Sequence, residues 1–140
     1  MSAEFFLDTN LLVYSFDEAN PAKRDKAREL IEQALESRRG VISWQVAQEF
    51  MNVALHKWQK PMTPADAREY LQTVLHPLCY VYPSSEIWLA ALRIAEESRY
   101  RFYDSLIVAA AIQSGATILY SEDLQDGRRF GPLQICNPFK

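Results

Sequence analysis

The stretch FFLDTN, residues 5–10, passes from apolar to polar within one residue. Residues 4–7 include a short, continuous apolar run, which is typical of a buried strand. Asp8 follows this run directly, and a charged carboxylate inside a core is unfavourable unless it is paired. We therefore expect a buried strand that ends at Asp8, at a rim where polar groups gather.

Strand and helix signals alternate along the rest of the chain. Capping residues and early prolines introduce apolar stripes with helical spacing, and short apolar runs predict strands. The predicted helices cover 10–16, 21–37, 45–58, 64–76, a segment that starts at 83–85, and 103–113; the predicted strands cover 4–7, 41–43, 78–82, 117–120 and 133–136.

This alternation predicts an α/β fold in which helices flank a central parallel sheet of four to five strands. We place the last strand at the edge of the sheet and expect Gly40 to end the turn before the second strand. A length of 140 residues suits one domain, 1–140, with one core. Such sheets bind ligands at the carboxyl ends of their strands, where Asp8 follows the first strand and Asp123 the fourth.

The composition is that of an ordinary globular protein, with 49% hydrophobic and 24% charged residues. No apolar run is long enough to cross a membrane, and the N-terminus lacks a signal-peptide pattern, so we expect a cytoplasmic protein. Cys79 and Cys136 are expected as free thiols, and two histidines without ligand spacing argue against structural zinc. The net charge of −3 provides no global basic field for nucleic acid, although local charge matters more than the total.

Two further acids occupy notable positions. Glu49 lies at the edge of the apolar stripe of its helix, and Asp104 lies at the start of the most apolar helix. Each has an ordinary explanation, because a stripe-edge glutamate reaches water and a helix-start aspartate acts as a cap. If they converge with Asp8 and Asp123, carboxylates about 4 Å apart repel by about 4 kcal/mol at an effective dielectric of about 20. Such a cluster favours raised pKa values or a hard divalent cation, magnesium or manganese.

Four motifs occur in order along the chain: FLDTN, QEF, YDSLIVAAA and LYSEDLQDG. In these motifs the chain resembles PIN-domain ribonucleases and, more closely, the VapC-type toxins of bacterial toxin–antitoxin modules. The resemblance implies a metal-dependent endoribonuclease, with one or two Mg²⁺ or Mn²⁺ ions, that leaves a 5′-phosphate and a 3′-hydroxyl. The alternative is a module with the same fold that binds RNA or protein without nuclease activity.

The resemblance also implies roles for particular residues. The acidic quartet would be Asp8, Glu49, Asp104 and Asp123, with Asp8, Asp104 and Asp123 as metal ligands and Asn10 and Ser121 as supporting polar residues. For Asp126 two roles are open, that of an additional acid near the metal and that of a structural residue.

Basic residues near the site are expected either to bind RNA phosphates or to be solvated surface charges. They are Arg101, Arg128 and Arg129. Lys23 to Arg28 are interpreted as an exposed helix face.

A partner surface is expected on the predicted helix at 45–58. Trp44, Met51 and Trp58 recur every seven residues on one side of it, and Met62 and Trp88 are added as contributors. They form either a wide buried face or a groove for a protein partner. The resemblance implies a cognate antitoxin and a homodimer. No membrane partner is expected, because no apolar run is long enough to cross a membrane.

Two other classes with acids at the rim of a parallel sheet fit less well. A haloacid-dehalogenase-like phosphatase needs a second Asp two residues after the first, where this chain has Asn10. A response-regulator receiver domain needs an acidic pair after the first strand and a lysine after the fifth, and neither is evident.

Overall fold

The sheet has six strands in the order β3-β2-β1-β4-β6-β5 in the computed structural model, which describes residues 2–140. Neighbouring strands from β3 to β6 are parallel, and β5 pairs antiparallel with β6. The predicted α/β fold is confirmed. The strands are β1 (Phe5–Leu7), β2 (Gly40–Ser43), β3 (Cys79–Val81), β4 (Ile118–Tyr120), β5 (Arg129–Phe130) and β6 (Leu133–Cys136).

The prediction that 133–136 forms the edge strand is wrong. The edge is β5, a strand of two residues that pairs with the outer side of β6. A strand this short has no measurable alternation of apolar and polar residues, so periodicity alone could not detect it.

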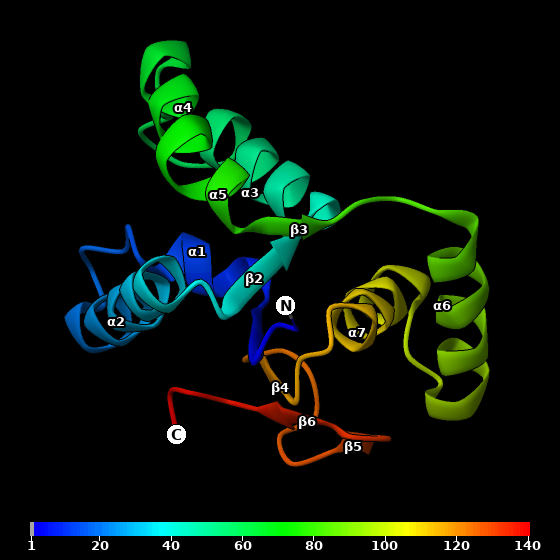
Figure 1. Cartoon of the computed structure of the whole chain (residues 1–140). Helices are drawn as coiled ribbons and strands as arrows, with labels where there is room; N and C mark the ends of the chain where they lie inside the picture. The colour runs from blue at the N-terminus through cyan, green and yellow to red at the C-terminus, as the bar shows by residue number, and fades with distance from the viewer. Residues whose placement is uncertain (1) are drawn as a thin grey trace.

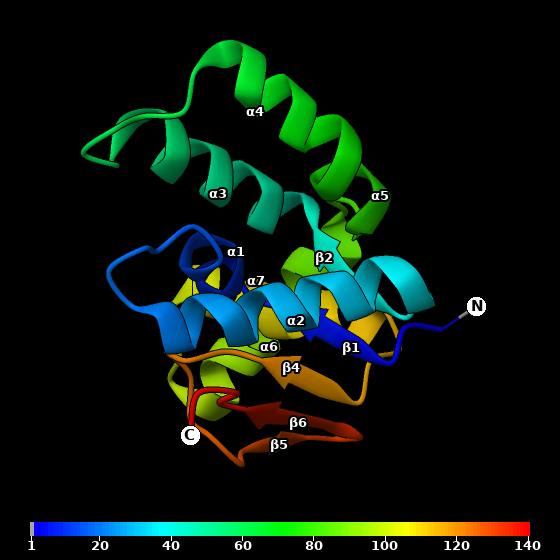
Figure 2. The ribbon, with the colours of Figure 1, turned by 90° about the vertical axis from the view of Figure 1, so that its left-hand side faces the viewer.

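Helices lie on both sides of the sheet and beyond one of its ends. Figure 1 shows α1 (Thr9–Tyr14) and α2 (Pro21–Ser37) on one side, and α6 (Ser85–Ser98) and α7 (Phe102–Gln113) on the other. α3 (Trp44–His56) and α4 (Pro64–Tyr70) run side by side above them, followed by a π-helical turn, η1 (Leu71–Leu75), and α5 (His76–Leu78) (Figures 1 and 2). Among residues 2–140, no helix combines the length and apolar character needed to span a membrane.

The capping signals in the sequence correctly locate several helix starts. The side chains of Asn20, Thr63 and Ser84 each accept a hydrogen bond from the backbone N–H three residues later. The helix predicted to end near His76-Pro77 continues to Leu78 through the π turn. Pro77 lies in the first positions of α5, where the missing N–H of proline is tolerated.

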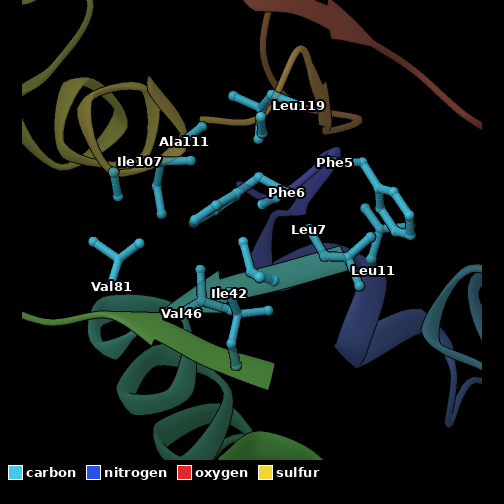
Figure 3. Close-up of a cluster of buried hydrophobic side chains, with 14 of the residues drawn as sticks. Phe5, Phe6, Leu7, Leu11, Ile42, Val46, Val81, Ile107, Ala111 and Leu119 are labelled. Carbon is cyan, nitrogen blue, oxygen red and sulfur yellow. The ribbon is translucent and has the colours of Figure 1, made fainter. Parts of the chain in front are cut away.

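The core depends on how β1 alternates between the two faces of the sheet. Phe6 points toward Ile107 and Ala111 of α7, while Phe5 lies on the opposite side (Figure 3). Phe6, Leu7, Val41, Ile42 and Leu119 are fully buried, which explains why the central strands read as continuous apolar runs.

Gly40 has a different role from the one predicted. The left-handed residue after α2 is Arg38, with a φ of 59°. Gly40 instead allows the ring of Phe5 to approach β2, because a Cβ atom there would overlap that ring and the side chain of Ala34. The glycine is therefore required by packing between strands rather than by a turn.

The strand order locates the functional end of the sheet. β1 lies between β2 and β4 in the sheet. After β1 the chain builds β2 and β3 on one side of it, and then crosses to the other side to build β4. Parallel sheets bind ligands at this kind of reversal, outside the carboxyl ends of the strands. Asp8 directly follows β1, and Ser121 directly follows β4.

Candidate active site

Asp8 is held at the junction of β1 and α1 by hydrogen bonds to both carboxylate oxygens. It is the N-cap residue of α1, and its Oδ1 accepts a hydrogen bond from the Thr9 backbone N–H at 2.7 Å. Ser121, which is fully buried after β4, donates its hydroxyl to Asp8 Oδ2 at 2.8 Å. The predicted supporting residue Ser121 therefore contacts Asp8 directly, and it joins the ends of the two strands at the reversal point.

Glu49 reaches the same region from α3. Its Oε1 accepts a hydrogen bond from the Thr9 hydroxyl at 2.6 Å. Its Oε2 accepts one from the Gln45 side-chain amide at 3.2 Å, and that amide also donates to the Tyr103 carbonyl at 3.1 Å. Two donors thus orient Glu49 from opposite ends of the carboxylate.

Thr9 and Gln45 were not assigned roles from the sequence. Thr9 stands between two assigned residues in the FLDTN motif, so its position next to Asp8 was a usable signal. Gln45 precedes Glu49 by one helical turn, and residues four apart on a helix lie on the same face.

Asp123 is connected to α1 by Asn10. The Asn10 side-chain amide donates to Asp123 Oδ2 at 3.1 Å. The other polar atom of that side chain, Oδ1, is buried and has no hydrogen-bond partner within the described residues. An unpaired buried acceptor is unfavourable, so this oxygen is available to a water or a cation at the site.

The four acids influence one another electrostatically. The pKa of Asp8 is raised from 3.8 to about 6, chiefly by burial and in smaller part by the charges of Glu49 and Asp123, against the lowering effect of its hydrogen bonds to Ser121 and the Thr9 N–H. The pKa of Asp104 is also raised, first by burial and then by the charges of Asp123 and Glu49, while Arg101 lowers it. The structure therefore brings the acids predicted as a quartet into one electrostatic neighbourhood.

The donors at this site are suited to a hard cation. Carboxylate, amide and hydroxyl oxygens gather there, which is the chemistry that magnesium and manganese prefer. Among residues 2–140, no three His, Cys, Asp or Glu side chains lie close enough to form a complete ligand set. Magnesium often binds through one or two carboxylates and takes its other ligands from water and substrate phosphates. The separated acids and the unpaired oxygen of Asn10 fit this mode of binding.

Asp126 does not join this group. Its Oδ1 accepts a hydrogen bond from the Asn137 backbone N–H at 2.7 Å, and its Oδ2 lies 3.7 Å from Lys140 Nζ. These contacts attach the loop after β4 to the C-terminal residues. Of the two roles left open by the sequence, the structure favours the structural one.

The three arginines near the site differ in their surroundings. Arg101 is exposed and acts electrostatically on Asp104. Arg128 lies over the rings of Tyr100 and Phe130 and donates to Gln125, while Arg129 is exposed and donates to Gln134. Arg101 is thus the arginine coupled to the acids, and phosphate binding by all three stays a prediction.

A family model identifies the fold at this point. Residues 5–126 match the model of the PIN domain. This chain belongs to the PIN-domain family. The matched range contains every acid of the predicted quartet.

Solved structures share the fold of this PIN domain over most of its length. A toxin–antitoxin complex from Klebsiella pneumoniae matches with a TM-score of 0.69 and 20% identity, covering 96% of this chain and 98% of that one. VapBC2 from Rickettsia felis, bound to a DNA fragment from its promoter, matches with 0.67 and 18%, covering 94% and 96%. VapC20 from Mycobacterium tuberculosis, a sarcin–ricin loop cleaving toxin, matches with 0.59 and 18%, covering 86% and 90%. Among curated proteins, no sequence matches this chain.

The PIN domain contains a second charged cluster beside the acids. Glu122 accepts hydrogen bonds from Lys23 of α2 and from the hydroxyl of Tyr14 of α1. The prediction that Lys23 belongs to a plain exposed helix face is therefore wrong, because it pairs with a glutamate that is distant in sequence. This cluster attaches the segment containing Ser121 and Asp123 to two helices.

The three residues predicted as one helical face belong to two different surfaces. α3 ends at His56, so Trp58 lies beyond it and packs against the rings of Phe16 and Phe50. Trp44, at the start of α3, is 45% exposed and lines a separate groove. The seven-residue spacing therefore does not describe a single surface.

Proposed function

We propose that this PIN domain is a metal-dependent endoribonuclease, the toxin of a type II toxin–antitoxin system, which hydrolyses RNA phosphodiester bonds through Asp8, Glu49, Asp104 and Asp123. The observation that carries the proposal is the environment of Asp8. Two hydrogen-bond donors hold this carboxylate at the reversal point of the sheet, and burial together with neighbouring acids raises its pKa to about 6. A site that is costly to keep negative in the free protein suits a divalent cation, which would supply the compensating positive charge.

Each side chain has a role that follows from its contacts. Asp8, Asp104 and Asp123 would hold one or two Mg²⁺ or Mn²⁺ ions. When bound, such an ion lowers the pKa of water and stabilises negative charge on the phosphate. Ser121 and Asn10 keep the carboxylates of Asp8 and Asp123 oriented.

Glu49 would act with the other acids as a member of the quartet. Thr9 and Gln45 each donate a hydrogen bond to one of its oxygens and so fix its orientation. Arg101, Arg128 and Arg129 are the candidates for binding RNA phosphates, and Arg101 is the one whose charge reaches an acid of the site.

The proposed protein partners are a cognate antitoxin and a second copy of this chain. Two of the similar structures are described as a toxin–antitoxin complex and a VapBC complex, which supports an antitoxin. A groove of about 470 Å³ is lined by Phe16, Trp58, Met62 and Tyr70 together with the charged residues Lys60, Asp66 and Glu69, so it offers a partner both apolar and charged contacts. We propose that the antitoxin binds in this groove. We also propose that the protein acts in the cytoplasm.

Cleavage of total cellular RNA by the purified chain, freed of antitoxin, tests the nuclease. Wild-type protein is compared in Mg²⁺, in Mn²⁺ and in EDTA, and the Asp104→Asn variant is prepared identically. Asp66→Asn is the matched control, because Asp66 is also an aspartate in the first turn of a helix but is exposed and outside the quartet. We expect metal-dependent cleavage that falls at least about 100-fold in Asp104→Asn and is unchanged in Asp66→Asn.

Three outcomes separate the proposal from its alternatives. Equal cleavage by Asp104→Asn and wild type would remove Asp104 from the mechanism. Cleavage that persists in EDTA would contradict the metal requirement. RNA binding without any cleavage by folded, metal-loaded wild type would favour the alternative function, a PIN-like module that only binds RNA or protein.

A further inference from the structure

Gln45 connects the two helices that carry Glu49 and Asp104. Its side-chain nitrogen donates one hydrogen bond to Glu49 Oε2 at 3.2 Å and another to the Tyr103 carbonyl at 3.1 Å. Glu49 lies on α3, one helical turn after Gln45, whereas Tyr103 lies at the start of α7 and immediately precedes Asp104. Figure 1 shows α3 above α7, so one amide group joins two separate helices.

A primary amide is suited to this position because its nitrogen carries two hydrogens. Both partners of Gln45, a carboxylate oxygen and a backbone carbonyl, only accept hydrogen bonds. A single neutral nitrogen can therefore satisfy both of them at once. A glutamate would lack the donors when ionised, and a lysine would add a positive charge that repels a cation at the acids.

The bond to Tyr103 is the polar contact that fixes the start of α7. Among the hydrogen bonds of residues 2–140, it is the only one that joins Phe102–Asp104 to another element. Arg101, the N-cap residue of α7, makes no capping bond with its side chain. Apart from the apolar packing of α7, the position of Asp104 relative to α3 therefore depends on Gln45.

The same amide completes a chain of hydrogen bonds among the acids. Thr9 donates its hydroxyl to Glu49 Oε1 and its backbone N–H to Asp8 Oδ1. Gln45 continues this chain from Glu49 to the residue before Asp104. Three acids from three parts of the fold thus belong to one network, and Gln45 is the member that includes Asp104.

The distance between Glu49 and Asp104 needs such a connection. The two acids are close enough for the charge of Glu49 to raise the pKa of Asp104, so the ionised carboxylates repel each other. A donor that binds both helices opposes their separation. Groups that orient metal ligands without touching the metal typically change metal affinity or activity by about tenfold to about 100-fold when they are replaced.

We propose that Gln45 is a positioning residue, which holds Asp104 at its distance from Glu49 and thereby sets the affinity of the acid site for a divalent cation. Gln45 acts through its hydrogen bonds to Glu49 and Tyr103 and is not itself a ligand. This role rests on the proposed function, in which the acids hold Mg²⁺ or Mn²⁺. It concerns cation binding by the free protein, so it can be measured without RNA.

Titration of the purified chain, freed of antitoxin, with Mn²⁺ tests this role. Electron paramagnetic resonance reports the free ion and so gives the dissociation constant. Gln45→Met keeps the length of the side chain without a donor, and Gln45→Asn keeps the amide on a side chain that is shorter by one methylene group. Gln48→Met is the matched control, because Gln48 is an exposed glutamine of the same helix.

We expect Gln45→Met to raise the dissociation constant for Mn²⁺ by about tenfold to about 100-fold. Gln45→Asn should also raise it, because the shorter side chain cannot reach both acceptors. In ¹⁵N NMR spectra, the backbone N–H signals of Tyr103 and Asp104 should shift in both Gln45 variants. Gln48→Met should match wild type in both measurements, and urea denaturation in EDTA checks that each variant is folded.

Several results would overturn the role of Gln45. An unchanged dissociation constant in a folded Gln45→Met, or in Gln45→Asn if Gln45→Met does not fold, would leave the two hydrogen bonds a purely structural role. Wild-type affinity in Gln45→Asn would show that spanning both acceptors is not required. An equal loss in Gln48→Met would assign the effect to the surface of α3 in general.

The same titration separates this role from the nuclease. Mn²⁺ binding that depends on Gln45 in a chain that cleaves no RNA would refute the nuclease and leave the role of Gln45 standing. Wild type that binds no Mn²⁺ would overturn both the role of Gln45 and the metal requirement of the proposed function.

Discussion

Replacing Asp8 by Asn should change how the free energy of unfolding depends on pH. In the folded chain, burial is the main reason that the pKa of Asp8 rises from 3.8 to about 6. The folded state therefore retains this proton where the unfolded chain has already released it. The stability contributed by the protonated group is fully present below the unfolded pKa and is lost as the pH rises through about 6.

The two pKa values give the size of the effect. Their difference is about 2, and since one pKa unit corresponds to about 1.4 kcal/mol, wild type should lose about 3 kcal/mol from this group. The Asp8→Asn variant has no proton to release there, and its amide can still pair with the Ser121 hydroxyl. Relative to wild type, the variant should therefore gain about 3 kcal/mol in unfolding free energy between about pH 4 and about pH 7.

Urea denaturation followed by tryptophan fluorescence measures this difference. Both proteins are unfolded in EDTA at a series of pH values, so that no divalent cation compensates the carboxylates. Glu36→Gln is the control, because Glu36 is an exposed acid on α2. Its profile should run parallel to that of wild type over the whole range.

Parallel profiles for Asp8→Asn and wild type would refute this reasoning, because they would mean that the pKa of Asp8 is the same in the folded and unfolded chains. Saturating Mg²⁺ provides a second check. A cation held by Asp8 stabilises the folded wild type at neutral pH, since it binds only the folded state. The same addition should stabilise Asp8→Asn less.

Three further perturbations test other parts of the structure. Gly40→Ala should lower the unfolding free energy by about 1–3 kcal/mol in urea denaturation, because the new methyl group overlaps the Phe5 ring. Combining it with Phe5→Leu should recover part of this loss; if the losses of the two single variants simply add in the double variant, the overlap is not the cause. Lys23→Met should raise the Mg²⁺ concentration needed for half-maximal RNA cleavage by about tenfold, since it removes the partner of Glu122 beside Asp123, while Lys23→Arg should restore it; an unchanged metal requirement would leave the ion pair a purely structural role. Trp58→Ala should weaken capture of the cognate antitoxin in calorimetry, and unchanged affinity with intact folding would exclude the groove at Trp58.

Local signals in the sequence were sufficient where structure depends on neighbouring residues. Asn20, Thr63 and Ser84 cap the helices they were expected to start, because a capping side chain acts on an N–H only three residues away. Apolar runs located the parallel strands for a similar reason, since strands buried on both faces read as continuous apolar segments. β5 is not predicted from the sequence, because a strand of two residues shows no periodic alternation of apolar and polar residues. The role of Gly40 is not predicted correctly, because the Phe5 ring that requires a glycine there is far away in the chain.

Local sequence signals specify most of the helices and strands, their order and the acids at strand and helix ends. Which polar groups meet depends on how the chain folds in three dimensions. Thr9 with Glu49, Ser121 with Asp8 and Lys23 with Glu122 are pairs separated by 40 or more residues, and their contacts exist only because β1 packs between β2 and β4. The raised pKa of Asp8 is likewise a property of burial and of neighbouring charges, which depend on three-dimensional distance and not on position in the chain.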